Sequence, residues 1–186
     1  IYGGSIGLGQ RLKFPDDFFT FYNEFSYQYY VLNNYFSTFA FSDGFANNFS
    51  FKTVLSRNSV DSPIYPKSGS NTTLTIKATL PYSLFRSNFG KNEVDYSAMS
   101  DQDVNKFVEY HKWKFQTQWY TRLTRGKRSF VLNTKAGFGY LGSYNSSLGT
   151  SSFERFYMGG DGLSGFSLDG REIIKFRGYG TGGLSP

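Results

Sequence analysis

The most regular pattern in the sequence is the stretch Phe19-Thr-Phe-Tyr-Asn-Glu-Phe-Ser-Tyr-Gln-Tyr-Tyr-Val31. Its odd-numbered positions are mainly aromatic, whereas its even-numbered positions are mostly polar and include Glu24 and Gln28. Alternation with a period of two predicts a β-strand that has one apolar and one polar face. Strands in globular proteins average about 5–6 residues, so this one is long, and a tilted strand of its length spans the hydrocarbon core of a bilayer.

The same alternation returns in four later segments and, more weakly, in one earlier segment. In each of them, apolar or aromatic positions alternate with Thr, Ser, Asn, Gln, Lys or Arg. The predicted strands are residues 2–13, 19–31, 45–56, 73–80, 112–123 and 130–140. We therefore predict an all-β chain whose consecutive strands pair as antiparallel neighbours.

The connections between these strands alternate in length. Residues 14–17, 65–69 and 124–127 are short and contain Pro, Gly or Asp, which favours tight turns. Residues 33–44 and 81–106 are longer, and so is everything after Tyr144. Short turns on one side and long loops on the other are typical of a transmembrane antiparallel β-barrel. Because such barrels have at least about eight strands, we predict a fragment of about six strands of a larger barrel.

The main alternative is a soluble β-sandwich or a large soluble antiparallel sheet, which would also have one polar face. A soluble sheet must bury its aromatic face against a second layer, and the sequence shows no second layer with a different pattern. In lipid, every backbone N–H and C=O needs a partner, and closure into a barrel removes the free edges. The pattern therefore favours the barrel, and the start at Ile1 indicates a piece of a longer chain.

The composition limits the chemistry that the chain can perform. Its 186 residues include 20% aromatics, no Cys and a single His, His111. The absence of Cys excludes disulfides and thiolate chemistry. The net charge of +6 comes from scattered Lys and Arg, which indicates a solvated polar face and no nucleic-acid partner.

Three motif matches do not predict a ligand site. Residues 137–142 and 160–165 match G-x-G-x-x-G, but neither precedes the helix that a dinucleotide site requires. The first lies in a predicted strand, where inward glycines make room for something packed inside the barrel. Residues 101–105 resemble the start of an EF-hand loop, but Lys106 and Lys112 replace its Gly and Glu. A solvated acidic loop is expected there.

We expect no enzymatic activity, no cofactor and no bound metal. The sequence has no G-x-S-x-G motif, and His111 lies at the loop end of a strand, where an interfacial role is favoured over catalysis. Tryptophans and phenylalanines at the apolar positions of the alternation are predicted to face lipid or the membrane interface. They are Phe21, Phe25, Phe49, Phe51, Trp113, Trp119 and Phe130.

Residues 156–179 are too rich in glycine to form a strand and end with Lys175-Phe-Arg-Gly-Tyr179. A guanidinium is always charged and makes several directed hydrogen bonds. In a loop that enters a polar lumen, Arg177 would bind a carboxylate on the wall, while Gly178 allows a close approach. The alternative is an ordinary surface arginine at a loop tip.

Two segments carry a family resemblance. Phe156-Tyr-Met-Gly-Gly160 followed by Phe176-Arg-Gly-Tyr179 resembles the inward-folding sixth extracellular loop of the outer-membrane-protein-85 superfamily. Ile64-Tyr-Pro-Lys-Ser-Gly-Ser70 is similar to a periplasmic turn of the same family, with Tyr65, Pro66 and Gly69 at its motif positions. The resemblance covers residues 45–186, and the earlier residues fit by strand pattern.

The resemblance implies a barrel of about sixteen strands preceded by periplasmic POTRA domains. Residues 1–143 would be six consecutive transmembrane strands, and residues 144–186 would start the inward-folding loop. The loop motif residues that would brace the lumen are Gly159, Gly160, Phe176, Arg177, Gly178 and Tyr179. The acidic partner of Arg177 would belong to a later strand outside this sequence.

Among family members, the chain most resembles the insertase branch in its Bacteroidetes form. This implies the folding and insertion of outer-membrane proteins in a Gram-negative bacterium. The implied partners are nascent outer-membrane proteins, accessory lipoproteins of the assembly machinery and lipids of the outer membrane. A two-partner secretion transporter, a TamA-type translocation protein and a passive porin-type channel remain as alternatives.

Overall fold

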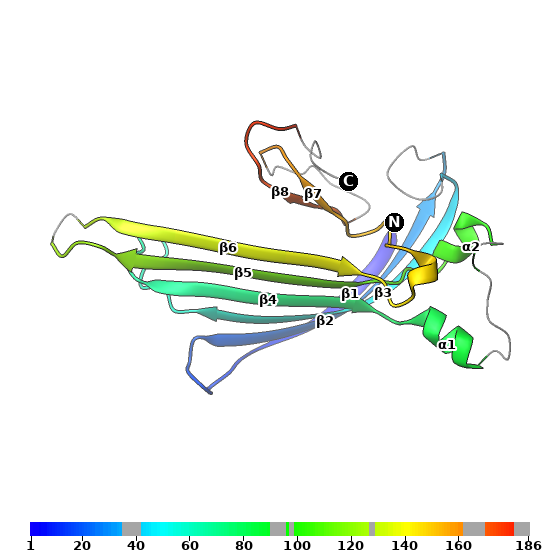
Figure 1. The fold of residues 1–186 in the computed structure, drawn as a ribbon. Coiled ribbons are helices and arrows are strands. Elements are labelled where there is room, and N and C mark those ends of the chain that lie inside the picture. Colours follow the sequence, from blue (N-terminus) through cyan, green and yellow to red (C-terminus); the bar gives the residue numbers. More distant parts are fainter. Residues whose placement is uncertain (35–41, 90–95, 97–98, 127–128, 162–169, 181–186) are drawn as a thin grey trace.

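The computed structural model describes residues 1–34, 42–89, 96, 99–126, 129–161 and 170–180. Its main element is one antiparallel sheet whose strands follow one another in sequence order (Figure 1). These strands are β1 (Tyr2–Arg11), β2 (Phe19–Leu32), β3 (Gly44–Asn58), β4 (Gly69–Thr79), β5 (His111–Arg122) and β6 (Val131–Gly142). The predicted all-β antiparallel fold is confirmed.

Strand β4 differs most from its predicted bounds, because it begins at Gly69 and not at residue 73. Asn71, Thr72 and Thr73 are three consecutive polar residues, which hides the alternation. Pairing on both sides extends the strand all the same, since Asn71 lies opposite Asn58 of β3 and Gln118 of β5. Tertiary pairing here outweighs the local sequence pattern.

The register keeps the aromatic positions of neighbouring strands on one face, which we call the outer face. Phe25 of β2 lies opposite Phe51 of β3, and Phe115 of β5 lies opposite both Leu74 and Phe138. Side chains opposite one another in a sheet share a face. The polar positions therefore gather on the other side, which we call the inner face.

The two ends of the sheet differ as the connection lengths predicted (Figure 1). The short turns lie together at one end, and the longer connections lie at the other. The connection between β4 and β5 contains two helices that the sequence analysis did not predict, α1 (Tyr82–Phe89) and α2 (Asp101–Asn105). Neither helix, nor any other in the described part of the chain, is long and apolar enough to span a membrane.

The expected solvated acidic loop at residues 101–105 is a short helix, α2, and the prediction of a loop is wrong. Its carboxylates Asp101 and Asp103 are exposed, as expected. Ser100 caps α2 by accepting a hydrogen bond from the Asp103 N–H (3.2 Å). Asp101 and Asp103 lie in the first turn, where carboxylates favour a helix. The acidic residues therefore stabilise a short helix and are not arranged as a calcium loop.

Among the described residues, buried apolar side chains are few, and they gather at the loop end of the inner face. The cluster consists of Tyr30, Leu32, Ala46, Val108, Tyr110 and Phe153. By contrast, large side chains of the outer face are open, with Phe25 51% and Trp119 54% exposed. A soluble protein buries most such side chains, so this distribution fits a sheet with lipid against its outer face.

The chain after β6 turns back over the inner face. A short 3-10 helix (Ser146–Leu148) leads into β7 (Phe156–Met158), which pairs in parallel with β8 (Glu172–Ile174). This small two-stranded sheet lies above one face of the large sheet (Figure 1). The Gly159 N–H donates to the Ile174 carbonyl (3.0 Å), and the Gly160 N–H donates to the Tyr179 carbonyl (2.8 Å).

Candidate functional site: the inner face and the loop that covers it

A row of lysines crosses the inner face. The register places Lys52 of β3 opposite Lys77 of β4, and Lys77 opposite Lys112 of β5. Lys114 follows on the same face of β5, two residues along the strand. Like charges directly opposite one another destabilise a sheet, so the row needs carboxylates to balance it.

Glu154, in the segment between β6 and β7, provides the first of these carboxylates. Its Oε1 lies 2.6 Å from the Lys77 Nζ, and its Oε2 lies 3.1 Å from the Lys112 Nζ. The three side chains are largely shielded from solvent, with Lys112 only 8% exposed. One buried carboxylate therefore joins two neighbouring strands through separate oxygen atoms.

Glu172, the first residue of β8, provides the second. It forms an ion pair with Lys112 at 3.4 Å and a closer one with Lys114. At the other end of the row, Lys52 pairs with Glu24 of β2 at 3.6 Å. Two glutamates of the loop and one of the wall thus pair with the four lysines of the row, which leaves an excess of one positive charge.

The backbone around Glu154 is shaped to deliver its side chain to the lysines. Glu154 has a φ of 62°, a left-handed conformation that residues other than glycine rarely adopt. Its neighbour Phe153 is buried and packs on the ring of Tyr30, with ring centroids 4.9 Å apart. Gly170 has a φ of 68°, which favours glycine, and a Cβ there would lie 2.6 Å from the Glu154 Oε1 and would displace that carboxylate.

Phe156 adds an apolar contact to the third neighbouring strand. Its ring lies so close to Gly139 of β6 that a Cβ on that glycine would be 2.8 Å from the ring. The Lys112 ammonium lies 4.6 Å from the centre of the same ring, which is within cation–π range. The prediction that a strand glycine makes room for an inward group is confirmed at Gly139.

The loop motif residues lie further along the same segment. Gly159 and Gly160 have φ values of 124° and 77°, which L-residues avoid. The rings of Phe176 and Tyr179 stack 5.2 Å apart. Arg177 is exposed, and its side chain forms no hydrogen bond or ion pair with any described residue. The predicted contact with an acidic residue of another strand stays a prediction.

The predicted turn motif occupies the connection between β3 and β4. Asp61 Oδ1 accepts hydrogen bonds from the N–H groups of Lys67 (2.9 Å) and Ser68 (3.2 Å), and these bonds lower the pKa of Asp61. Gly69 has a φ of 103°, and a Cβ there would lie 2.2 Å from the Ser59 carbonyl oxygen. Tyr65 is 80% exposed, and Pro66 precedes Lys67 in the turn.

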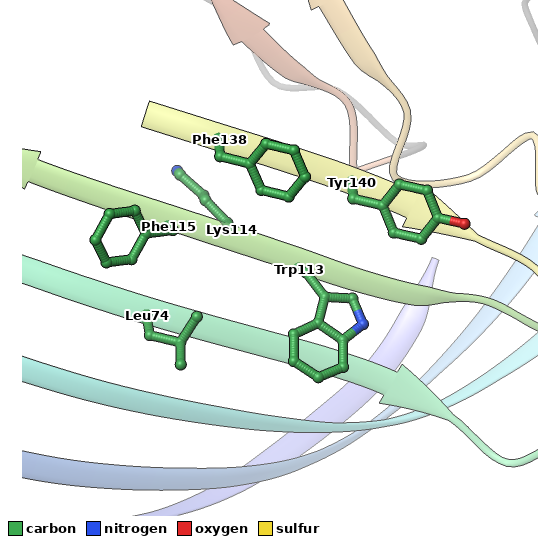
Figure 2. A pocket seen from close by; sticks show the side chains of 6 residues that line it. All are labelled: Leu74, Trp113, Lys114, Phe115, Phe138 and Tyr140. Atoms are coloured by element: carbon green, nitrogen blue, oxygen red, sulfur yellow. The ribbon is translucent and has the colours of Figure 1, made fainter. Parts of the chain in front are cut away.

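On the outer face, the predicted lipid-facing aromatics are open to different degrees. Phe25, Phe51, Trp113, Trp119 and Phe130 are exposed, whereas Phe21 and Phe49 are half-buried. Figure 2 shows a shallow apolar hollow of this face, lined by Leu74 and by rings from β5 and β6. Its lining rings are Trp113, Phe115, Phe138 and Tyr140.

His111 belongs to an aromatic group at the loop end of β5. The Trp113 Nε1–H donates to the His111 Nδ1 (3.1 Å), and the rings of Tyr140 and Tyr144 lie 5.7 and 5.3 Å away. This environment fits the expected interfacial position of His111. Within the described ranges, no group of three or more His, Asp or Glu side chains is arranged to hold a metal ion.

Comparison with protein families identifies the fold. The family model described as the Omp85 superfamily domain matches residues 2–186. The chain belongs to the Omp85 superfamily. A comparison with curated proteins gave no significant match. Omp85 proteins are insertases or transporters of the Gram-negative outer membrane and not catalysts in the usual sense, and membership of the family points to an interaction with outer-membrane protein substrates.

The residues that attach the loop to the wall were not predicted from the sequence. These are Lys77, Lys112, Lys114, Glu154 and Glu172. The alternation does place the lysines at polar positions of β4 and β5, so the sequence predicts the face on which they lie but not their partners. The Omp85 loop motif accounts for the aromatic and glycine positions, but it contains neither glutamate.

Proposed function

We propose that the protein is a BamA-type insertase of the Bacteroidetes form, the central component of the β-barrel assembly machinery. One observation carries the proposal: the segment with both loop motifs folds back on the inner face of an Omp85 barrel wall and is attached there. Such a loop stiffens the wall from inside. A stiff wall would let the barrel open at a weak seam elsewhere without collapsing.

The proposed activity makes and breaks no covalent bond and needs no cofactor or ATP. A nascent outer-membrane protein would enter at the seam, where free strand edges offer backbone hydrogen bonds to its own strands. The driving force is the burial of apolar surface in lipid and the pairing of every backbone N–H and C=O. Accessory lipoproteins and the lipids of the outer membrane would be the other partners.

Within this mechanism, the structure in hand would be the wall opposite the seam. Residues 1–143 would supply six consecutive transmembrane strands, and residues 144–186 the start of the inward-folding loop. Arg177 would reach an acidic residue of a later strand. Arg177 is exposed in the described part of the chain, so its guanidinium can reach such a partner.

Arg177→Glu tests this role of the loop motif. The reversed charge would repel the proposed acidic partner, so we expect the full-length variant to assemble or work poorly. The measurement is the level of outer-membrane proteins in cells that depend on the variant. Wild-type levels would contradict the proposal, and Arg177→Lys, which keeps the charge but loses the planar fork, should fall between.

The alternative within the family is a transporter dedicated to one passenger, either a two-partner secretion transporter or a TamA-type protein. A passive porin fits less well, because β7 and β8 cover the inner face that would line its channel. Depletion of the full-length protein, followed by mass spectrometry of the outer membrane, separates these functions. A general fall of barrel proteins supports the insertase, whereas loss of one secreted protein supports the exporter.

A further inference from the structure

We propose that Glu154 and Glu172 are positioning residues that hold the inward loop on the lysines of β4 and β5, as an attachment separate from Arg177. The attachment itself is argued from the contacts of the described residues. Its importance for insertion rests on the function proposed above. Neither glutamate belongs to the loop motifs that the sequence resemblance predicted.

Charge balance is the first argument. Lys77, Lys112 and Lys114 gather on one face, and Glu154 and Glu172 are the carboxylates paired with them in the described part of the chain. Removal of one partner from a shielded ion pair leaves an uncompensated charge, which is strongly unfavourable. If the loop lifted away, three ammonium groups would face one another, so the lysines favour the attached position.

The geometry of Glu154 is the second argument. Its two oxygens are used by different lysines, at 2.6 Å and 3.1 Å. A glutamine in the same place would offer one oxygen and one NH2 group, and the NH2 would point at an ammonium. The left-handed backbone of Glu154 and the close approach of Gly170 also show a site fitted around this carboxylate.

The third argument is that the loop joins three neighbouring strands. Glu154 contacts β4 and β5, Glu172 contacts β5, and Phe156 lies against Gly139 of β6. Contacts on three strands resist shear and bending between them in a way that a contact on one strand does not. Arg177 takes part in none of these contacts, so the two attachments can be broken independently.

The test is hydrogen exchange of the full-length protein in lipid bilayers. The variant is the double substitution Glu154→Gln and Glu172→Gln. The reporters are the amides of Gly159 and Phe176, which donate to the carbonyls of Ile174 and Gly160 within the loop and are not themselves substituted. We expect these amides to exchange at least about tenfold faster in the variant, because loss of the ion pairs lowers the free energy of local opening.

The matched control is Glu24→Gln. Glu24 pairs with Lys52 of the same row and accepts a hydrogen bond from Tyr22. Neither partner belongs to the loop, and Glu24 forms no ion pair with the loop's described residues, 144–161 and 170–180. We expect this variant to leave exchange in the loop unchanged. Unchanged loop exchange in the double variant would overturn the proposal, and so would equal acceleration in the Glu24→Gln control.

Charge reversal gives a second, independent check. Glu172→Lys alone should accelerate loop exchange, and the added substitution Lys114→Glu should restore part of the protection by re-forming the pair in the opposite sense. Absence of any rescue would count against a specific ion pair. Because exchange is measured without substrate, its outcome is separate from that of the depletion experiment, which tests the insertase function.

Discussion

The two faces of β5 show opposite rules of burial at consecutive positions. Trp113 is 42% exposed on the outer face, whereas its neighbour Lys112 is 8% exposed on the inner face. The charged side chain is therefore better shielded than the aromatic one. The comparison fits a sheet that faces lipid on one side, as predicted, and is covered by its own loop on the other.

The difference has energetic consequences. Exposed apolar surface would cost about 25 cal/mol per Å2 in water, but it costs nothing of this kind against acyl chains. The inner face instead depends on pairs of charges that must be matched one by one. We therefore expect the outer face to tolerate exchanges among apolar residues and the inner face to react strongly to a single change of charge.

The largest effect is expected for Lys112→Glu, which would place three carboxylates together, since Lys112 contacts both Glu154 and Glu172. Breaking a buried ion pair costs about 3–5 kcal/mol, so the folded fraction of the full-length protein should fall markedly. The heat-dependent shift in gel mobility that marks folded barrels measures it. A wild-type folded fraction would mean that the inner face is less sensitive than its burial indicates.

Phe115→Arg tests the contact of the outer face with lipid. A charge that faces the middle of the bilayer costs about 2–4 kcal/mol in a barrel, so folding into lipid vesicles should weaken by that amount. The matched control Phe115→Leu should cost much less, because it keeps the surface apolar. Similar losses for both variants would contradict a lipid contact at this position and favour a packing contact.

The contact between loop and wall is tested at Gly139. Gly139→Val would push its side chain into the Phe156 ring, because even a Cβ would lie 2.8 Å from it. Overpacking of this kind costs about 1–3 kcal/mol, measured as a lower unfolding midpoint in urea. Gly137→Ala is the control on the same strand, where the nearest atom lies 3.7 Å from the added Cβ and little loss is expected.

The smallest effect is expected at the turn between β3 and β4, where both faces end. The N–H groups of Lys67 and Ser68 hold the pKa of Asp61 below its ordinary value. A lowered folded-state pKa means that the contribution is present above the unfolded-state pKa, about 3.9, and is lost as pH falls through the folded-state value. A carboxyl titration by NMR with a midpoint at or above the ordinary value would contradict this.

The large sheet could be predicted from the sequence because the alternation within each strand shows which of its side chains lie on the apolar face and which on the polar face. In β2 aromatic residues such as Phe25 alternate with polar residues such as Glu24 and Ser26 along most of the strand, and the turns contain Pro and Gly. Helix α1 was missed although Pro81 directly precedes Tyr82, its first residue. Pro at this point is a common start signal of a helix, but residues 81–106 were predicted only as a long connection between strands.

The loop attachment could not be predicted in the same way. The polar phase of β5 places Lys112 and Lys114 on the inner face, but only the register shows that Lys77 lies beside Lys112. The register depends on turn lengths that sequence patterns set only to within a few residues. Glu154 and Glu172 reach the lysines through tertiary contacts and a left-handed backbone, which leave no periodic signal.

The ion pair between Glu154 and Lys77 joins residues that are 77 positions apart. Hairpins between successive strands close much shorter segments, and the entropic cost of closure rises with the length closed. Contacts between distant positions therefore form late in folding. Lys77 and Lys112 lie side by side only when β4 and β5 are paired in the correct register. We therefore expect the loop to dock last, and only on a wall whose strands are correctly paired.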